Sequence, residues 1–217
     1  MSSLEMDRWR LIVPVKGQLS AKTRLHPPAG VARADLAHAF ALDTLTAVFS
    51  GIPSGRVFVV TSDELTAAFV REHGGTVLPD PGKGLNPAIR AGVGHVQQDQ
   101  AWGPTAVLLG DIPTLRAKDL AIALATCSLH ARALVPDASG SGTVLLSALR
   151  PQDLDPRFGV NSAREHGLEC DRLDLDLPAL RTDVDDDEAL RRALAIGVGT
   201  NTAAVLHHPR ARSAAGD

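Results

Sequence analysis

The chain has 217 residues, 44% of them hydrophobic and 22% charged, with a formal net charge of −3; this supplies the core of one globular domain, which we place at residues 1–206. The near-neutral charge excludes general nucleic-acid binding, and a 3% aromatic content without tyrosine excludes stacking surfaces for single strands. No apolar run reaches the roughly 18 residues that cross a bilayer, and no signal peptide is indicated. Cys127 and Cys170 lack the spacing of a disulfide framework or zinc ribbon. We therefore expect a cytoplasmic protein.

Strand and helix patterns alternate along the first two thirds of the chain. The long helix at 31–49 is indicated by Leu42, Leu45 and Phe49, which recur at spacings of three and four. Strands are predicted at 10–15, 56–61, 76–78, 105–109 and 132–136, and helices at 31–49, 64–72, 87–98 and 118–126. This alternation predicts parallel strands joined by helices.

The pattern changes after residue 136. A strand at 142–149 follows a Gly-Ser turn with no helix between, which favours antiparallel pairing at a mixed edge of the sheet. Residues 157–166 are predicted as a loop that runs into a short helix, and 188–194 as the last helix. The polar tail at 207–217 has no periodicity and is predicted to be disordered. The fold class is therefore α/β, with three layers and a mostly parallel sheet.

Asp111 closes an apolar run, VLLGDIP, that has the composition of a buried parallel strand. In open α/β sheets, ligands bind at the carboxyl ends of the strands. A carboxylate at that edge can hold a divalent metal against a phosphate, whereas the alternative is that Asp111 caps the next helix.

Three cations follow the first predicted strand, at Lys16, Lys22 and Arg24. Phosphates need cationic donors at such an edge. The segment matches neither the P-loop nor the dinucleotide-binding pattern, and a solvated basic loop is the alternative.

Three further loops carry polar or small residues. In DPGKGLN, Asn86 is interpreted first as a helix N-cap, and contact of Gly84 and Asn86 with a nucleotide is the second interpretation. DASGSGT is typical of an anion-binding turn and equally of a hairpin connection. RFGVNS begins a short helix, where the Gly159 amide, the Ser162 hydroxyl and the helix N-terminus could together hold a carboxylate or phosphate. The alternative is that Asn161 or Ser162 only caps the helix.

The densest acidic cluster is TDVDDDE, at 182–188. Asp185 and Glu188 have the spacing of a capping box for the last helix. Asp183 is left for another role. Together with Asp111 it would suit Mg²⁺, which takes oxygen ligands and keeps several waters.

Six segments, in this order along the chain, resemble the guanylyltransferases of coenzyme F420 biosynthesis: VPVKGQLSAKTRL, DPGKGLNPAI, LLGDIPTL, GSGTVLL, RFGVNSAREH and TDVD. Members of that family act on 2-phospho-L-lactate or, in actinobacteria, on phosphoenolpyruvate. The likeness extends from about residue 10 to 194. AKTRL and RFGVNS are its distinctive parts, whereas LLGD is widespread among nucleotidyltransferases. The family usually has Thr-Pro after its Asp-Val-Asp, where this chain has Asp186 and Asp187.

The resemblance implies a nucleotidyltransferase fold related to glycosyltransferase A domains, and it implies roles for named residues. Asp111 and Asp183 would hold Mg²⁺ and, with Lys22, form the catalytic set. The expected acceptor-binding residues are Thr143, Gly159 and Ser162, and the expected nucleotide-binding residues are Lys16, Lys22, Arg24, Gly84 and Asn86.

The implied reaction transfers GMP from GTP to phosphoenolpyruvate and releases pyrophosphate, and a downstream transferase of the F420 pathway would take the product. The Ala- and Arg-rich composition favours the actinobacterial acceptor. The alternatives are 2-phospho-L-lactate or 3-phosphoglycerate as acceptor, a different nucleotidyltransferase of the same fold, or a nucleotide-binding regulator without catalysis. We expect neither a nucleic acid nor a membrane as partner.

Overall fold

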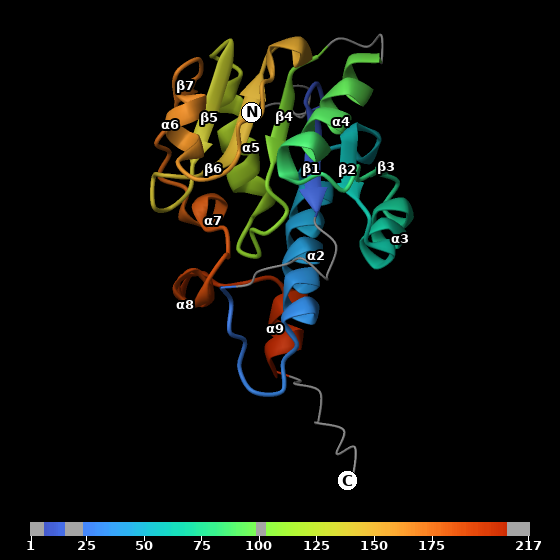
Figure 1. Ribbon diagram of the computed structural model, residues 1–217, viewed down its shortest axis with the longest axis vertical. Helices are drawn as coiled ribbons and strands as arrows, with labels where there is room; N and C mark the ends of the chain where they lie inside the picture. Colours follow the sequence, from blue (N-terminus) through green and yellow to red (C-terminus); the bar gives the residue numbers. More distant parts are fainter. Residues whose placement is uncertain (1–6, 16–23, 99–102, 208–217) are drawn as a thin grey trace.

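The computed structural model describes residues 7–15, 24–98 and 103–207, which form a seven-stranded sheet covered by helices (Figure 1). The strand order across the sheet is β3-β2-β1-β4-β6-β5-β7. The strands are β1 Arg10–Val15, β2 Val57–Thr61, β3 Thr76–Pro79, β4 Thr105–Leu108, β5 Arg132–Pro136, β6 Thr143–Ala148 and β7 Asp171–Arg172.

The helices cover both faces of this sheet. They are α2 Arg33–Gly51, α3 Glu64–Glu72, α4 Leu85–Gln98, α5 Ala117–Cys127, α6 Ser162–His166, α7 Pro178–Arg181, α8 Asp187–Ile196 and α9 Thr200–His207, with short 3₁₀ turns at Ser54–Arg56 and Pro151–Asp153. None of the helices in these described ranges is long and apolar enough to cross a membrane.

Alternation along β1 divides the core between the two faces. Leu11 and Val13 pack in one cluster with side chains of α2 and α5, such as Leu45 and Leu124. Ile12 points to the other face and packs with α4. All three residues have no exposed surface, as expected for a strand buried on both faces.

The predicted strands are all present, and β1, β2, β3 and β4 pair in parallel as expected. The strand predicted at 142–149 is antiparallel, but its predicted place at an edge is wrong. β6 lies inside the sheet, antiparallel to both β4 and β5. Every residue of β6 is buried, because its run TVLLSA faces helices on one side or the other. The edge on that side of the sheet is instead the two-residue strand β7, and the opposite edge is β3.

The prediction that 188–194 is the last helix is also wrong, because α9 follows and packs along α2 (Figure 1). The buried Asp43 of α2 fixes the start of α9. Its carboxylate accepts from the backbone N–H groups of Asn201 and Thr202 and from the Asn201 side chain, each at 2.9 Å. His207 belongs to this helix, and the rest of the predicted disordered tail lies outside the described residues.

Candidate active site

Asp111 follows β4 at the carboxyl edge of the sheet, where Gly110 lets the chain after β4 pass close to the end of β1. The N–H of Leu109 donates to Val144 O at 3.0 Å, which extends the β4–β6 ladder up to this point. A Cβ atom on Gly110 would lie 2.8 Å from the carbonyl oxygen of Pro14 and 2.9 Å from Cγ2 of Val15. The loop therefore needs glycine at this position to pass beside the end of β1.

We expect Gly110→Ala to lower the free energy of unfolding by about 1–3 kcal/mol, because the new methyl group meets backbone that cannot move aside cheaply. Urea denaturation measures this change. Gly94→Ala is the matched control, since a Cβ there meets nothing within 4 Å and lies in helix α4. That control should gain about 0.5–1 kcal/mol. Equal effects of the two substitutions would contradict the close approach at Gly110.

The residues that follow Asp111 are held from three sides. The N–H of Ile112 donates to the buried Thr44 hydroxyl of α2 at 3.0 Å. The Thr114 hydroxyl donates to Ala179 O of α7 at 2.7 Å. The N–H of Gly199 donates to Pro113 O at 2.8 Å. Asp111 therefore sits on a fixed loop, and it does not cap the next helix, because α5 begins at Ala117 with Arg116 in the cap position.

The segment of Asp183 lies beside that of Asp111, the residue with which Asp183 is predicted to hold Mg²⁺. The N–H of Val184 donates to Asp111 O at 3.0 Å, so the backbones of the two segments run side by side. Both carboxylates are half-buried, and Oδ1 of Asp111 is fully buried. Such an oxygen carries a large desolvation cost unless a cation or donor stabilises its charge.

The donor chemistry of this pair fits Mg²⁺. In the described part of the chain, no group of three or more His, Cys, Asp and Glu side chains is arranged to hold a metal. Mg²⁺ does not need one, because it usually binds through one or two carboxylates while water and substrate phosphates complete its shell. The two aspartates that could hold it are Asp111 and Asp183.

The remaining acidic residues of this segment do other work. The N-cap of α8 is Asp186, which accepts from Ala189 N at 2.8 Å, so the predicted capping box at Asp185 is one residue too early. Asp187 accepts from the backbone N–H of His26 at 2.6 Å, and its other oxygen lies 3.0 Å from Nδ1 of the same residue. The His26 backbone N–H and then its ring lower the pKa of the Asp187 carboxyl.

The exposed Arg24 lies 3.9 Å from the carboxylate of Asp185. Arg24, the last cation of the predicted basic loop, therefore lies next to the acidic segment that carries Asp183. Lys16 and Lys22, the other predicted nucleotide-binding cations, lie outside the described residues.

The predicted acceptor-binding residues come together at the same edge, around the start of β6, which pairs with the end of β4. The N–H of Ala163 donates to Ser141 O at 3.0 Å and so joins the start of α6 to the turn before β6. Thr143 and Ser162 are buried, whereas Gly159 is exposed. The loop bends through Gly159 at φ 144° and Asn161 at φ 57°. Asn161 occupies the N-cap position of α6 but makes no side-chain capping bond.

Asn86 does not cap α4, contrary to its first interpretation. It lies in the first turn of that helix, and its side chain bonds the backbone of Phe158 twice: Nδ2 donates to the carbonyl oxygen at 2.9 Å, and Oδ1 accepts from the N–H at 2.8 Å. Gly84 precedes the helix with φ 96°. Contact of Gly84 and Asn86 with a nucleotide stays a prediction.

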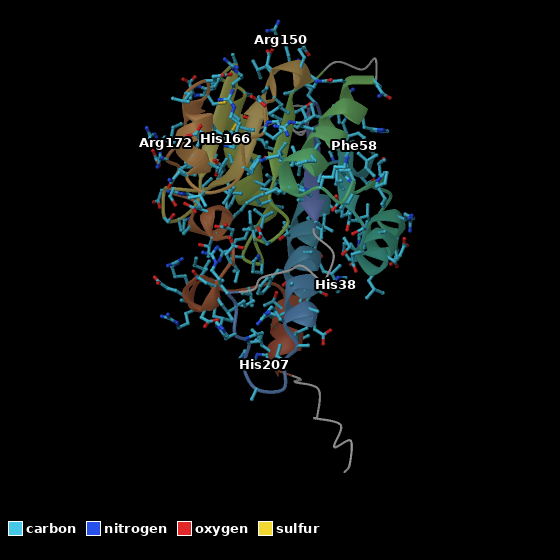
Figure 2. All side chains as sticks on the ribbon, viewed as in Figure 1. His38, Phe58, Arg150, His166, Arg172 and His207 are labelled. Atoms are coloured by element: carbon cyan, nitrogen blue, oxygen red, sulfur yellow. The ribbon has the colours of Figure 1, made fainter. Side chains whose placement is uncertain are left out.

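His166 was not among the site residues predicted from the sequence. His166, labelled in Figure 2, is the last residue of α6 and is only 2% exposed, and its side chain contacts the start of β6. Its Nδ1 is 2.9 Å from the Thr143 hydroxyl, and its Nε2 accepts from Arg157 N–H at 2.9 Å. One available signal was its position four residues after Ser162, on the same face of the predicted helix.

In sequence, this chain is similar to guanylyltransferases over most of its length. Residues 9–211 match the family described as guanylyl transferase CofC like. A phosphoenolpyruvate guanylyltransferase of Streptomyces coelicolor is 42% identical over 203 residues, which covers 91% of this chain and 95% of that protein. One from Geodermatophilus obscurus is 42% identical over 208 residues, with 91% and 94% covered. One from Streptomyces scabiei is 40% identical over 206 residues, with 91% and 95% covered.

Solved structures with much lower sequence identity share the fold. The 4-diphosphocytidyl-2C-methyl-D-erythritol synthase of Anaerococcus prevotii superposes with a TM-score of 0.57 at 11% identity, over 89% of this chain and 97% of that one. A cytidylyltransferase of Leptospira borgpetersenii gives 0.54 at 13% identity, over 85% and 84%. The predicted nucleotidyltransferase fold is confirmed, and the sequence match over residues 9–211 shows that the chain belongs to the CofC-like guanylyl transferase family.

Proposed function

We propose that this protein transfers GMP from GTP to the phosphate of phosphoenolpyruvate and releases pyrophosphate. The observation that carries the proposal is the pairing of Asp111 with the Asp183 segment through the Val184–Asp111 backbone bond, in a chain about 40% identical to proteins named phosphoenolpyruvate guanylyltransferase. A nucleotide-binding regulator would not need two aspartates on adjoining segments at the ligand-binding edge of the sheet.

In this reaction an oxygen of the acceptor phosphate attacks the α-phosphorus of GTP. A new P–O–P bond forms, the bond from the α-phosphorus to the bridging β-phosphate oxygen breaks, and pyrophosphate leaves with that electron pair. The acceptor phosphate is already ionised near neutral pH, so no general base is required. Catalysis then depends on positioning and on neutralising charge.

Asp111 and Asp183 would hold Mg²⁺, and the bound ion would offset the negative charge of both sets of phosphates. The role of the chain is to keep the two carboxylates fixed, which the bonds from Thr44, Val184 and Gly199 do for the Asp111 loop. Arg24, at the end of the basic loop, is on the acidic side of the site, where it would meet the departing pyrophosphate.

We also propose a cytoplasmic location, in keeping with the free thiols of Cys127 and Cys170, and a downstream transferase that consumes the product.

Thermal stabilisation separates this enzyme from a regulator. With a GTP analogue whose α,β-bridging oxygen is replaced by CH₂, no turnover occurs. We expect phosphoenolpyruvate and Mg²⁺ at about 100 times Kd to add about 5–10 °C to the midpoint reached with the analogue alone. A midpoint that responds to the analogue but not to further addition of acceptor and Mg²⁺ would favour the regulator.

A further inference from the structure

The three residues before Gly159 are each held by a side chain from another part of the chain. Arg90 of α4 donates to Pro156 O at 3.1 Å. His166 of α6 accepts from Arg157 N–H through Nε2 at 2.9 Å. Asn86 bonds both the N–H and the carbonyl of Phe158. A loop usually has mobile backbone, but these contacts fix the backbone up to the exposed glycine.

We propose that Asn86 and His166 are positioning residues that clamp the backbone of residues 156–158, so that the loop at Gly159 is preformed for the acceptor. This inference rests on the proposed function for the identity of the acceptor. Asn86 is the last residue of the segment at 80–86, whose Gly84 and Asn86 are predicted to contact the nucleotide. The clamp therefore ties the nucleotide side of the site to its acceptor side through a single side chain.

The chemistry of His166 suits this role. Its Nε2 accepts a backbone N–H, so a neutral ring carries its proton on Nδ1 and donates it to the Thr143 hydroxyl. Burial, and then the positive charge of Arg157, lower the pKa of His166 from 6.5 to about 4, so the ring is neutral at pH 7. One ring thus joins the start of β6 to the loop.

The side chains of Asn and Gln can separate the two bonds of His166. The amide oxygen of Gln reaches the place of Nε2, so His166→Gln retains an acceptor for Arg157 N–H. His166→Asn instead retains a donor near the place of Nδ1, toward Thr143. Because the clamp acts on the loop, we expect His166→Asn and Asn86→Ala each to raise KM for phosphoenolpyruvate about tenfold, and His166→Gln to stay within about threefold.

KM for GTP should change less than about twofold in the two His166 variants, which a general loss of structure would not allow. Gln97→Ala is the matched control, because Gln97 also extends from α4 and donates its amide to a backbone carbonyl, that of Pro151, away from the loop. This control should leave KM for phosphoenolpyruvate unchanged.

Amide hydrogen exchange tests the clamp without any substrate. We expect the N–H groups of Arg157 and Phe158 to be protected in the wild-type protein. Asn86→Ala should expose Phe158 N–H, and His166→Asn should expose Arg157 N–H.

Rapid exchange of both amides in the wild-type protein would overturn the clamp. An unchanged KM for phosphoenolpyruvate in Asn86→Ala and His166→Asn, with both amides still protected in these variants, would also overturn it. If the protein releases no pyrophosphate with phosphoenolpyruvate, the proposed function fails while the exchange data still decide whether the clamp exists. The KM measurements are then made with whichever acceptor supports pyrophosphate release.

Discussion

Asp111→Asn is expected to lower the rate of pyrophosphate release about 10²- to 10³-fold without unfolding the protein. Asn keeps the size of the side chain and leaves the backbone bonds of the loop to Thr44 and Val184 in place, but it removes the negative charge that would hold Mg²⁺. Stopped assays of pyrophosphate release measure the rate, and thermal unfolding confirms that the fold is retained.

Asp183→Asn should act in the same direction, and the double variant should lose less than the product of the two single effects, because both carboxylates serve one ion. Asp176→Asn is the control, since it makes the same chemical change at an exposed carboxylate outside the site. A near-wild-type rate for Asp111→Asn would rule out the metal assignment.

Asp43→Ala is expected to cost about 3 kcal/mol of stability, a fall of roughly 6–12 °C in Tm. The buried carboxylate accepts three hydrogen bonds from the first turn of α9, and Ala leaves those donors without their acceptor. Because Gly199, directly before α9, also bonds Pro113 of the Asp111 loop, loosening α9 should reach the active site.

Calorimetry measures this loss, and hydrogen exchange locates it. The amides of α9 should exchange faster than those of α4. Asp43→Asn retains one acceptor oxygen and should lose less stability than Asp43→Ala. Wild-type Tm in Asp43→Ala would show that α9 does not depend on this carboxylate.

Six of the seven strands in the described residues could be predicted because each is an apolar run bounded by turn residues, whereas β7 consists only of Asp171 and Arg172. Ile12, for example, is buried by α4 and its neighbour Leu11 by α2 and α5, so β1 is apolar from Leu11 to Val15. The position of β6 inside the sheet could not be predicted, because local sequence fixes that a strand forms and not which neighbour it pairs with. The same holds for α9, which depends on a carboxylate 158 residues away in sequence.

In the candidate site, too, local features could be predicted from the sequence, whereas contacts between distant segments could not. The loop of Asp111 could be located from its position after an apolar strand, and Asp183 from the acidic segment that precedes the last predicted helix. The role of Asn86 could not be predicted, because its partner Phe158 is 72 residues distant and an Asn near a helix start is typical of an N-cap. The bonds of His166 could not be predicted, because its partners Thr143 and Arg157 lie in other segments of the chain.

The most direct test of the proposed reaction is pyrophosphate release from GTP and Mg²⁺, in parallel with phosphoenolpyruvate, 2-phospho-L-lactate, 3-phosphoglycerate and no acceptor. We predict release with phosphoenolpyruvate alone. Release only with another acceptor would retain the chemistry and correct the substrate. No release from folded protein in any of the four reactions would contradict the proposed guanylyl transfer.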